Sequence, residues 1–195
     1  MMRIITGRAR GTKLAAPKGE VTRPTAERTK EAVFSILQFD IAGREVLDLF
    51  AGSGQMGLEA LSRGAAHAFF CDRSKDAVEV IRANALKTRL APQCEVLCAD
   101  YASALQTLRR KQTFDLVFLD PPYAAGLLAD VLSRLARSHL LRDGATLVCE
   151  TGEGDVLANV EARACYSVER ETKYGIAYVT ILKYHEPKTL EEETK

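Results

Sequence analysis

The 195-residue sequence lacks the residue patterns of metal sites and of nucleophilic hydrolases. Its five cysteines form no CxxC pair and no cluster with histidine, so we predict that the protein binds no metal. The three histidines stand apart from any serine or cysteine motif, which argues against a Ser–His or Cys–His nucleophile. Scattered cysteines within apolar segments are typical of reduced, buried thiols in a cytoplasmic protein. The residues concerned are Cys71, Cys94, Cys98, Cys149 and Cys165, and His67, His139 and His185.

The sequence also lacks long apolar runs. Residues 1–11 (MMRIITGRARG) contain no apolar segment of the kind that a signal peptide requires, and no run approaches the length of a transmembrane helix. Internal repeats and linker-like stretches are absent as well. We therefore expect a cytoplasmic protein with one α/β domain, without membrane partners.

The formal net charge is only +1, but the charge is unevenly distributed. Residues 1–30 carry eight basic and two acidic side chains, and the rest of the chain is mildly acidic. A basic arm on an acidic body favours contact with the phosphates of a nucleic acid, although a solvated surface segment is the alternative. The predicted RNA-binding residues are Arg3, Arg8, Arg10, Lys13, Arg23 and Arg28.

Apolar runs alternate with helical patterns from Gly43 onward, which predicts a parallel sheet covered by helices on both faces. Two final strands without a helix between them predict an antiparallel hairpin at the edge of the sheet. Before Gly43 we expect a small hairpin or arm, and then a helix with Thr25 as its N-cap. The expected strands are 45–50, 66–71, 94–98, 114–119, 145–150, 164–171 and 176–184; the expected helices are 56–63, 75–86, 103–110, 126–137 and 155–161.

The fold class predicted is thus a doubly wound, mostly parallel, seven-stranded Rossmann-like sheet. We divide the chain into a basic arm and helix (1–40), a catalytic domain (41–185) and a charged, flexible tail (186–195).

The most informative motif is Asp120-Pro121-Pro122-Tyr123, directly after the apolar strand 114–119. An acid at the carboxyl end of a strand lies where open α/β sheets bind ligands. The prolines stiffen the turn and remove N–H donors, so that backbone carbonyls can accept hydrogen bonds, and the tyrosine ring offers a stacking face for a base. Acceptors beside a stacking face fit an aromatic ring with an exocyclic amine. An ordinary turn after a strand is the alternative.

The first strand leads into a glycine-rich loop. Gly52, Gly54 and Gly57 satisfy the pattern GxGxxG, and Asp72 follows at the end of the second strand, as in nicotinamide-dinucleotide sites. Two features argue against that cofactor. Asp48 would crowd a pyrophosphate, and the chain has no evident partner for hydride transfer.

S-adenosylmethionine explains the same residues better, because it carries an ammonium group and no phosphate. Asp48 can compensate the ammonium, Asp72 can bind the ribose hydroxyls, and Asp100 can accept from the adenine amine, with the N–H of Tyr101 or Ala102 nearby. Each acid alone could instead be a helix cap or turn residue. The predicted cofactor-binding residues are Thr25, Asp48, Phe50, Ala51, Gly52, Ser53, Gly54, Asp72, Arg73, Asp100 and Tyr101; the predicted catalytic residues are Asp120, Pro121, Pro122 and Tyr123.

Several segments together resemble one family, the bacterial 16S rRNA guanine-N2 methyltransferases. They are Met2 to Gly7, Arg23-Pro24-Thr25, residues 31–37 (EAVFSIL), 47–54 (LDLFAGSG), 57–65 (GLEALSRGA) and Asp120 to Tyr123. The resemblance covers residues 1 to about 184. Its most specific parts are the Arg-Pro-Thr element and the Gly-Leu-Glu-Ala-Leu-Ser-Arg-Gly helix, since Asp-Pro-Pro-Tyr also occurs in DNA adenine methyltransferases.

The resemblance implies a class I methyltransferase that transfers a methyl group from S-adenosylmethionine to a guanine of 16S rRNA in the small ribosomal subunit. It also implies that Arg23 and Thr25 lie at the rim of the active site. Gln55-Met56 departs from the family, which usually has two small or aliphatic residues there. We expect a monomer. The alternatives are an adenine-N6 methyltransferase of DNA or RNA and an rRNA-binding assembly factor without turnover.

Overall fold

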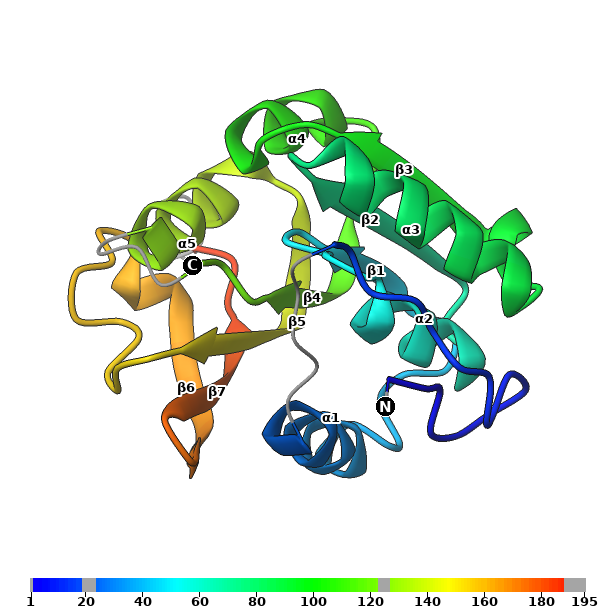
Figure 1. The fold of residues 1–195 in the computed structure, drawn as a ribbon. Coiled ribbons are helices and arrows are strands. Elements are labelled where there is room, and N and C mark those ends of the chain that lie inside the picture. The colour runs from blue at the N-terminus through cyan, green and yellow to red at the C-terminus, as the bar shows by residue number, and fades with distance from the viewer. Residues whose placement is uncertain (1, 19–23, 123–126, 188–195) are drawn as a thin grey trace.

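A computed structural model describes residues 2–18, 24–122 and 127–187. Its centre is a seven-stranded sheet in the order β3-β2-β1-β4-β5-β7-β6 (Figure 1). Strands β1 to β5 are parallel, whereas β7 runs antiparallel to both β5 and β6. The strands are β1 (Glu45–Asp48), β2 (His67–Asp72), β3 (Cys94–Cys98), β4 (Phe114–Leu119), β5 (Leu141–Thr151), β6 (Tyr166–Tyr174) and β7 (Ala177–Tyr184).

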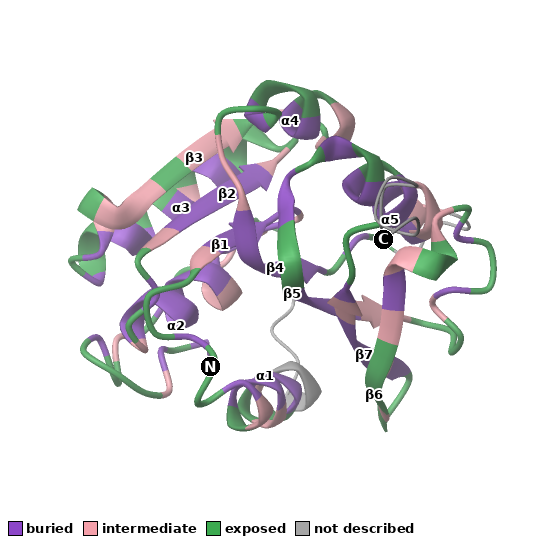
Figure 2. Cartoon of the chain, turned by 180° about the vertical axis from the view of Figure 1, so that it is seen from behind, coloured by how far each residue is buried: buried purple, intermediate pink, exposed green. Residues whose placement is uncertain are grey.

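Helices cover both faces of this sheet. One face packs against α1, α2 and α3 and against the N-terminal arm (residues 2–16), and the other packs against α4 and α5. Figure 2 shows most of the length of the central strands as buried, together with the helix faces that pack on them. The helices are α1 (Pro24–Ile36), α2 (Gln55–Ser62), α3 (Lys75–Lys87), α4 (Tyr101–Leu108) and α5 (Leu127–Ser138), with short 3₁₀ turns η1 (Ala91–Gln93) and η2 (Arg163–Cys165).

The predicted fold class is therefore confirmed, including the antiparallel hairpin at the end of the chain. None of the helices in the described ranges is long and apolar enough to cross a membrane.

Three local predictions were wrong. The segment 155–161 forms turns and not a helix: Asp155 has a left-handed φ of 54°, and the amides of Ala158 and Val160 bond to carbonyls three residues back. Leu157 and Val160 are spaced as on one face of a helix, but here they are turn residues whose side chains are buried in the core. Helix α1 begins at Pro24, so Thr25 lies inside its first turn and is not the N-cap. Cys98 is an exposed thiol because β3 is an edge strand.

The N-terminal arm is a short hairpin, as predicted. Arg3 and Lys13 form an antiparallel bridge, and the amides of Ile4 and Leu14 bond to the carbonyls of Thr12 and Met2 at 3.0 and 2.9 Å. In Figure 1 this arm runs along the outside of α2. The arm is thus bound to the domain along its length.

Candidate active site

A cavity of about 660 Å³ opens at the carboxyl ends of the parallel strands. It lies over the point where β1 separates β2 on one side from β4 on the other, which is where doubly wound sheets bind their ligands. The predicted residues that line it are Arg3, Asp48, Phe50, Ala51, Gly52, Ser53, Asp72, Arg73, Asp100, Tyr101, Asp120, Pro121 and Pro122.

Asp48 ends β1 and is almost completely buried, with 4% of its surface exposed. Its Oδ2 accepts a hydrogen bond from the amide of Gly57 at 3.0 Å, and no cation of the described residues pairs with it. Burial raises the pKa of Asp48 to about 7, the Gly57 amide opposes this rise, and the nearby Asp72 adds to it. A buried carboxylate without a protein cation suits a positively charged ligand group.

The loop between β1 and α2 needs glycine at two positions for different reasons. Gly54 precedes α2 with a φ of 75°, a left-handed conformation that side chains disfavour. Gly57 allows α2 to pack closely on β2, because a Cβ atom there would lie 2.4 Å from the ring of Phe70. Asp72 holds the loop from the side, since its Oδ2 accepts from the Gly52 amide at 2.9 Å.

Asp100 is a helix cap, the alternative left open for each strand-end acid. Its Oδ1 accepts from the amides of Ala102 and Ser103 at 3.0 and 3.1 Å, and the Ser103 hydroxyl and amide hold the pKa of Asp100 below its ordinary value. The Ala102 amide is therefore already engaged by Asp100. Asp100 nevertheless lines the cavity.

The rings of Phe50 and Tyr101 form an apolar wall of the cavity. Their centroids are 5.9 Å apart, and the Tyr101 hydroxyl donates to Asp130 at 2.7 Å. That hydrogen bond fixes the orientation of the Tyr101 ring. The wall offers a flat ligand group a surface to pack against.

Asp120, Pro121 and Pro122 follow β4 and lie at the edge of the same cavity. Tyr123 and Arg23 lie outside the described residues, and of Thr25 only the backbone, in the first turn of α1, is described. The structure thus brings Asp120, Pro121 and Pro122 of the predicted acceptor motif to the same cavity as most of the predicted cofactor residues.

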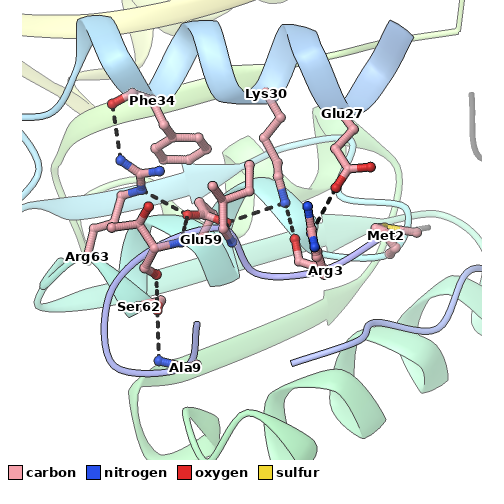
Figure 3. A network of polar contacts seen from close by, with 12 residues as sticks. Met2, Arg3, Ala9, Glu27, Lys30, Phe34, Glu59, Ser62 and Arg63 are labelled. Carbon is pink, nitrogen blue, oxygen red and sulfur yellow. Dashed lines mark hydrogen bonds and ion pairs between the residues drawn. The ribbon is translucent and has the colours of Figure 1, made fainter. Parts of the chain in front are cut away.

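The arm contributes to this cavity through a buried network of charges (Figure 3). Glu59 of α2 has no exposed surface, and its carboxylate accepts from the amides of Ile5 and Thr6 at 2.7 and 3.0 Å. The same carboxylate pairs with Arg63 at 2.9 Å and with Lys30 of α1 at 3.4 Å. The network joins the arm, α1 and α2 beside the cavity.

Lys30 also donates to the backbone carbonyl of Arg3 at 2.6 Å, and Arg3 pairs with Glu27 at 3.0 Å (Figure 3). Together with Met2, these three side chains line the cavity. The network therefore fixes the start of the arm at the cavity rim.

The predicted RNA-binding residues do not form one patch. Arg3 lies at the cavity, whereas the amide of Arg8 bonds to the carbonyl of Ser62, the last residue of α2 and the one farthest from the cavity. The side chain of Arg8 contacts Gln93. Arg10, Lys13 and Arg28 are exposed.

Sequence reasoning did not assign Glu59, Lys30 or Glu150 to the site. Glu59 and Lys30 gave no signal, because their partners, apart from Arg63 one turn along α2 from Glu59, lie 27 to 54 residues away in the sequence. Glu150 lines the cavity near the end of β5, and its position at the end of a predicted strand could have identified it. Among the described residues, no group of three or more His, Cys, Asp or Glu side chains could hold a metal ion.

Comparison with known proteins agrees with this geometry. Residues 2–183 match the family described as Conserved hypothetical protein 95. The chain is 36% identical to "Ribosomal RNA small subunit methyltransferase D" of Escherichia coli (strain K12) over 91% of this chain and 87% of that protein. The protein of the same name from Haemophilus influenzae is 35% identical over 82% of this chain and 83% of that protein.

The structure of the candidate methyltransferase yhhF from Escherichia coli is also similar. It has a TM-score of 0.84 and 32% identity, with 95% of this chain and 98% of that chain covered. The chain therefore belongs to the Conserved hypothetical protein 95 family, whose members share the fold of class I, S-adenosylmethionine-dependent methyltransferases.

Proposed function

We propose that this protein transfers a methyl group from S-adenosylmethionine to the exocyclic N2 amine of a guanine in 16S rRNA. The observation that carries the proposal is the placement of Asp120 and Pro121 at the same cavity as Asp48 and Asp72. The names of the two relatives support ribosomal RNA of the small subunit as the substrate.

The residues present fit S-adenosylmethionine. The buried carboxylate of Asp48, which no cation of the described residues neutralises, suits its ammonium group, Asp72 suits its ribose hydroxyls, and the wall of Phe50 and Tyr101 suits its adenine. Asp100, Arg73 and the loop residues 50–54 complete the proposed cofactor site, and Thr25 remains a proposed member of it. When bound, the cofactor supplies an electrophilic methyl group on a sulfonium centre.

The protein's part in the reaction is to position the amine. The lone pair of a guanine amine is delocalised into the ring, which makes the amine a poor nucleophile. Hydrogen bonds from its two N–H groups to Asp120 and to the Pro121 carbonyl would help to localise the lone pair and direct it at the methyl group, while Tyr123 stacks on the flipped base. The alkylated amine is acidic enough to release its proton to Asp120 or to water. Positioning of this kind supplies roughly 7–11 kcal/mol in well-oriented reactions.

Transfer of label tests the substrate class. Small ribosomal subunits that lack the modification, incubated with the protein and methyl-labelled S-adenosylmethionine, are expected to gain label in their 16S rRNA. Absence of label in the RNA, with cofactor binding confirmed separately, would favour an assembly factor that binds RNA without turnover.

The raised pKa of Asp48 predicts a pH-dependent cofactor affinity. Because burial raises the pKa from 3.8 to about 7, the free protein holds a proton on Asp48 below pH 7, and a cationic ligand must displace it. The association constant for S-adenosylmethionine should therefore rise between pH 5.5 and 7.5 by at most about tenfold per pH unit and then level off. This range lies below the ordinary pKa of about 7.7–8 of an α-amino group, so the ligand stays charged.

Calorimetric titrations at several pH values provide the measurement, and D48N is the control. This variant should bind more weakly and without the pH slope. The stability of the free protein gives a second check, because it should change with pH in the opposite direction to the cofactor affinity. Between pH 3.8 and 7 the folded state holds more protons on Asp48 than the unfolded state, so the contribution of Asp48 to the free energy of unfolding falls as pH rises. An unchanged slope in D48N would assign the proton to another group.

A further inference from the structure

Glu150 lies at the cavity but has no role in the reaction described above. It stands near the carboxyl end of β5 and is half-buried. No hydrogen bond or ion pair found among the described residues engages its carboxylate. Burial raises the pKa of Glu150, and a hydrogen-bond donor from a ligand would favour its ionised form.

The register of the sheet places Glu150 beside Asp120. Leu119 of β4 pairs with Cys149 of β5 in the parallel ladder, so Asp120 and Glu150 are the next residues along the two chains. Adjacent strands lie about 4.8 Å apart, and side chains alternate between the faces of a sheet. Leu119 and Cys149 belong to the apolar cluster under α4 and α5, so the two acids belong to the other face, that of α1 and α2. Both acids line the same cavity.

This pairing matches the hydrogen-bonding edge of guanine. On that edge the N2 amine and the N1–H are neighbouring donors, whereas adenine has a lone pair at N1. An enzyme that flips its target base reads this edge by hydrogen bonds. We propose that Glu150 accepts the guanine N1–H while Asp120 and the Pro121 carbonyl hold the N2 amine, and that Glu150 thereby selects guanine. This inference rests on the proposed function.

The same carboxylate acts against adenine. With adenine in the pocket, the ionised carboxylate of Glu150 would face the lone pair of N1, and neither group could donate a hydrogen bond unless Glu150 first bound a proton. Specificity commonly uses such a repulsive contact together with an attractive one. The arrangement gives a physical reason why the protein would select guanine over adenine, which the Asp-Pro-Pro motif alone does not explain.

Two substitutions at Glu150 separate the effect of its acceptor oxygens on activity from the effect of its side-chain volume. E150Q keeps one neutral acceptor oxygen, and E150L has a similar size but no acceptor. On unmodified small subunits we expect kcat/KM to fall about 10- to 100-fold in E150L and less in E150Q, because hydrogen bonds to charged groups are the strong ones. Affinity for S-adenosylmethionine should stay within about twofold. The matched control is E153Q, in the exposed loop after β5, which should behave as the unmodified protein does.

A modified base tests the contact itself. Small subunits reconstituted with ligated 16S rRNA can carry 2-aminopurine, which keeps the 2-amine and has no N1–H, at the mapped target. The unmodified protein should methylate this substrate at least as poorly as E150L methylates guanine, because Glu150 then faces the lone pair of N1, and E150L should lose nothing further on it.

The role of Glu150 would be overturned if the loss caused by E150L and the loss caused by 2-aminopurine simply add, or if E150L is as active as the unmodified protein. Either result leaves the proposed function intact as long as the unmodified protein forms N2-methylguanosine. If the unmodified protein itself forms no N2-methylguanosine, the proposed function fails, and the inference fails with it.

Discussion

Replacement of Asp120 by alanine is expected to lower kcat for methyl transfer by about 1,000-fold or more, because the amine loses the acceptor that positions it. Affinity for S-adenosylmethionine should change little, since the proposed cofactor contacts come from Asp48, Asp72 and the Phe50 and Tyr101 rings and not from Asp120. D120N, which keeps one acceptor oxygen, should retain more activity than D120A. Single-turnover transfer to unmodified small subunits gives the rate, and calorimetry gives the cofactor affinity.

The matched control is D143A. Asp143 is an exposed acid at the amino end of β5, far along the strand from the cavity, where it accepts from the Glu186 amide at 3.0 Å. D143A should transfer methyl groups at the normal rate. If D120A loses cofactor binding to the same extent as turnover, Asp120 belongs to the cofactor site and the division of roles is wrong.

The charge of Glu59 is expected to be the largest single electrostatic contribution to stability. In E59Q the buried ammonium of Lys30, which is 2% exposed, loses its anionic partner, and Arg63 loses one as well. Breaking a buried ion pair on one side typically lowers the free energy of unfolding by about 3–5 kcal/mol. Urea denaturation at pH 7 measures this loss. E79Q, on the exposed side of α3, should be close to neutral.

The pH dependence identifies Lys30 as the source of the loss. Burial lowers the pKa of Lys30, and Glu59 opposes this effect. A lysine whose folded pKa lies below its unfolded value makes stability rise with pH up to about 10.5, so the deficit of E59Q should shrink between pH 7 and 10. K30M in the E59Q background should restore part of the stability. A deficit that is constant with pH and insensitive to K30M would instead point to the lost bonds to Ile5 and Thr6.

The sequence predicted much of the site because parallel strands place their carboxyl ends at one edge of the sheet. Asp48, Asp72 and Asp100 each end or follow an apolar run, so alternation of strands and helices alone was enough to bring them together with Asp120. The pattern could not show which acid also serves as a cap. Asp100 caps α4 because its carboxylate accepts from the amides of Ala102 and Ser103. The sequence is compatible both with this cap and with a contact to the adenine amine.

The contacts of Glu59 could not be predicted for a different reason. A glutamate in an amphipathic helix is ordinarily exposed, and nothing in residues 55–62 shows that the arm covers this face of α2. The basic arm was likewise interpreted from its charge alone. The structure shows that Lys30 forms a buried ion pair with Glu59 and that Arg8 lies at the end of α2 away from the cavity. The number of basic residues in the arm is therefore larger than the number of positive charges exposed at the cavity rim.

The identity of the methylated nucleoside decides whether the protein modifies the N2 amine of guanine. Unmodified small subunits are incubated with the protein and labelled S-adenosylmethionine, the 16S rRNA is digested, and the labelled nucleoside is separated and identified by mass. We expect N2-methylguanosine, formed by the unmodified protein and reduced about 1,000-fold or more with D120A. N6-methyladenosine in its place would show that the proposed function is wrong and assign the protein to the adenine-modifying branch.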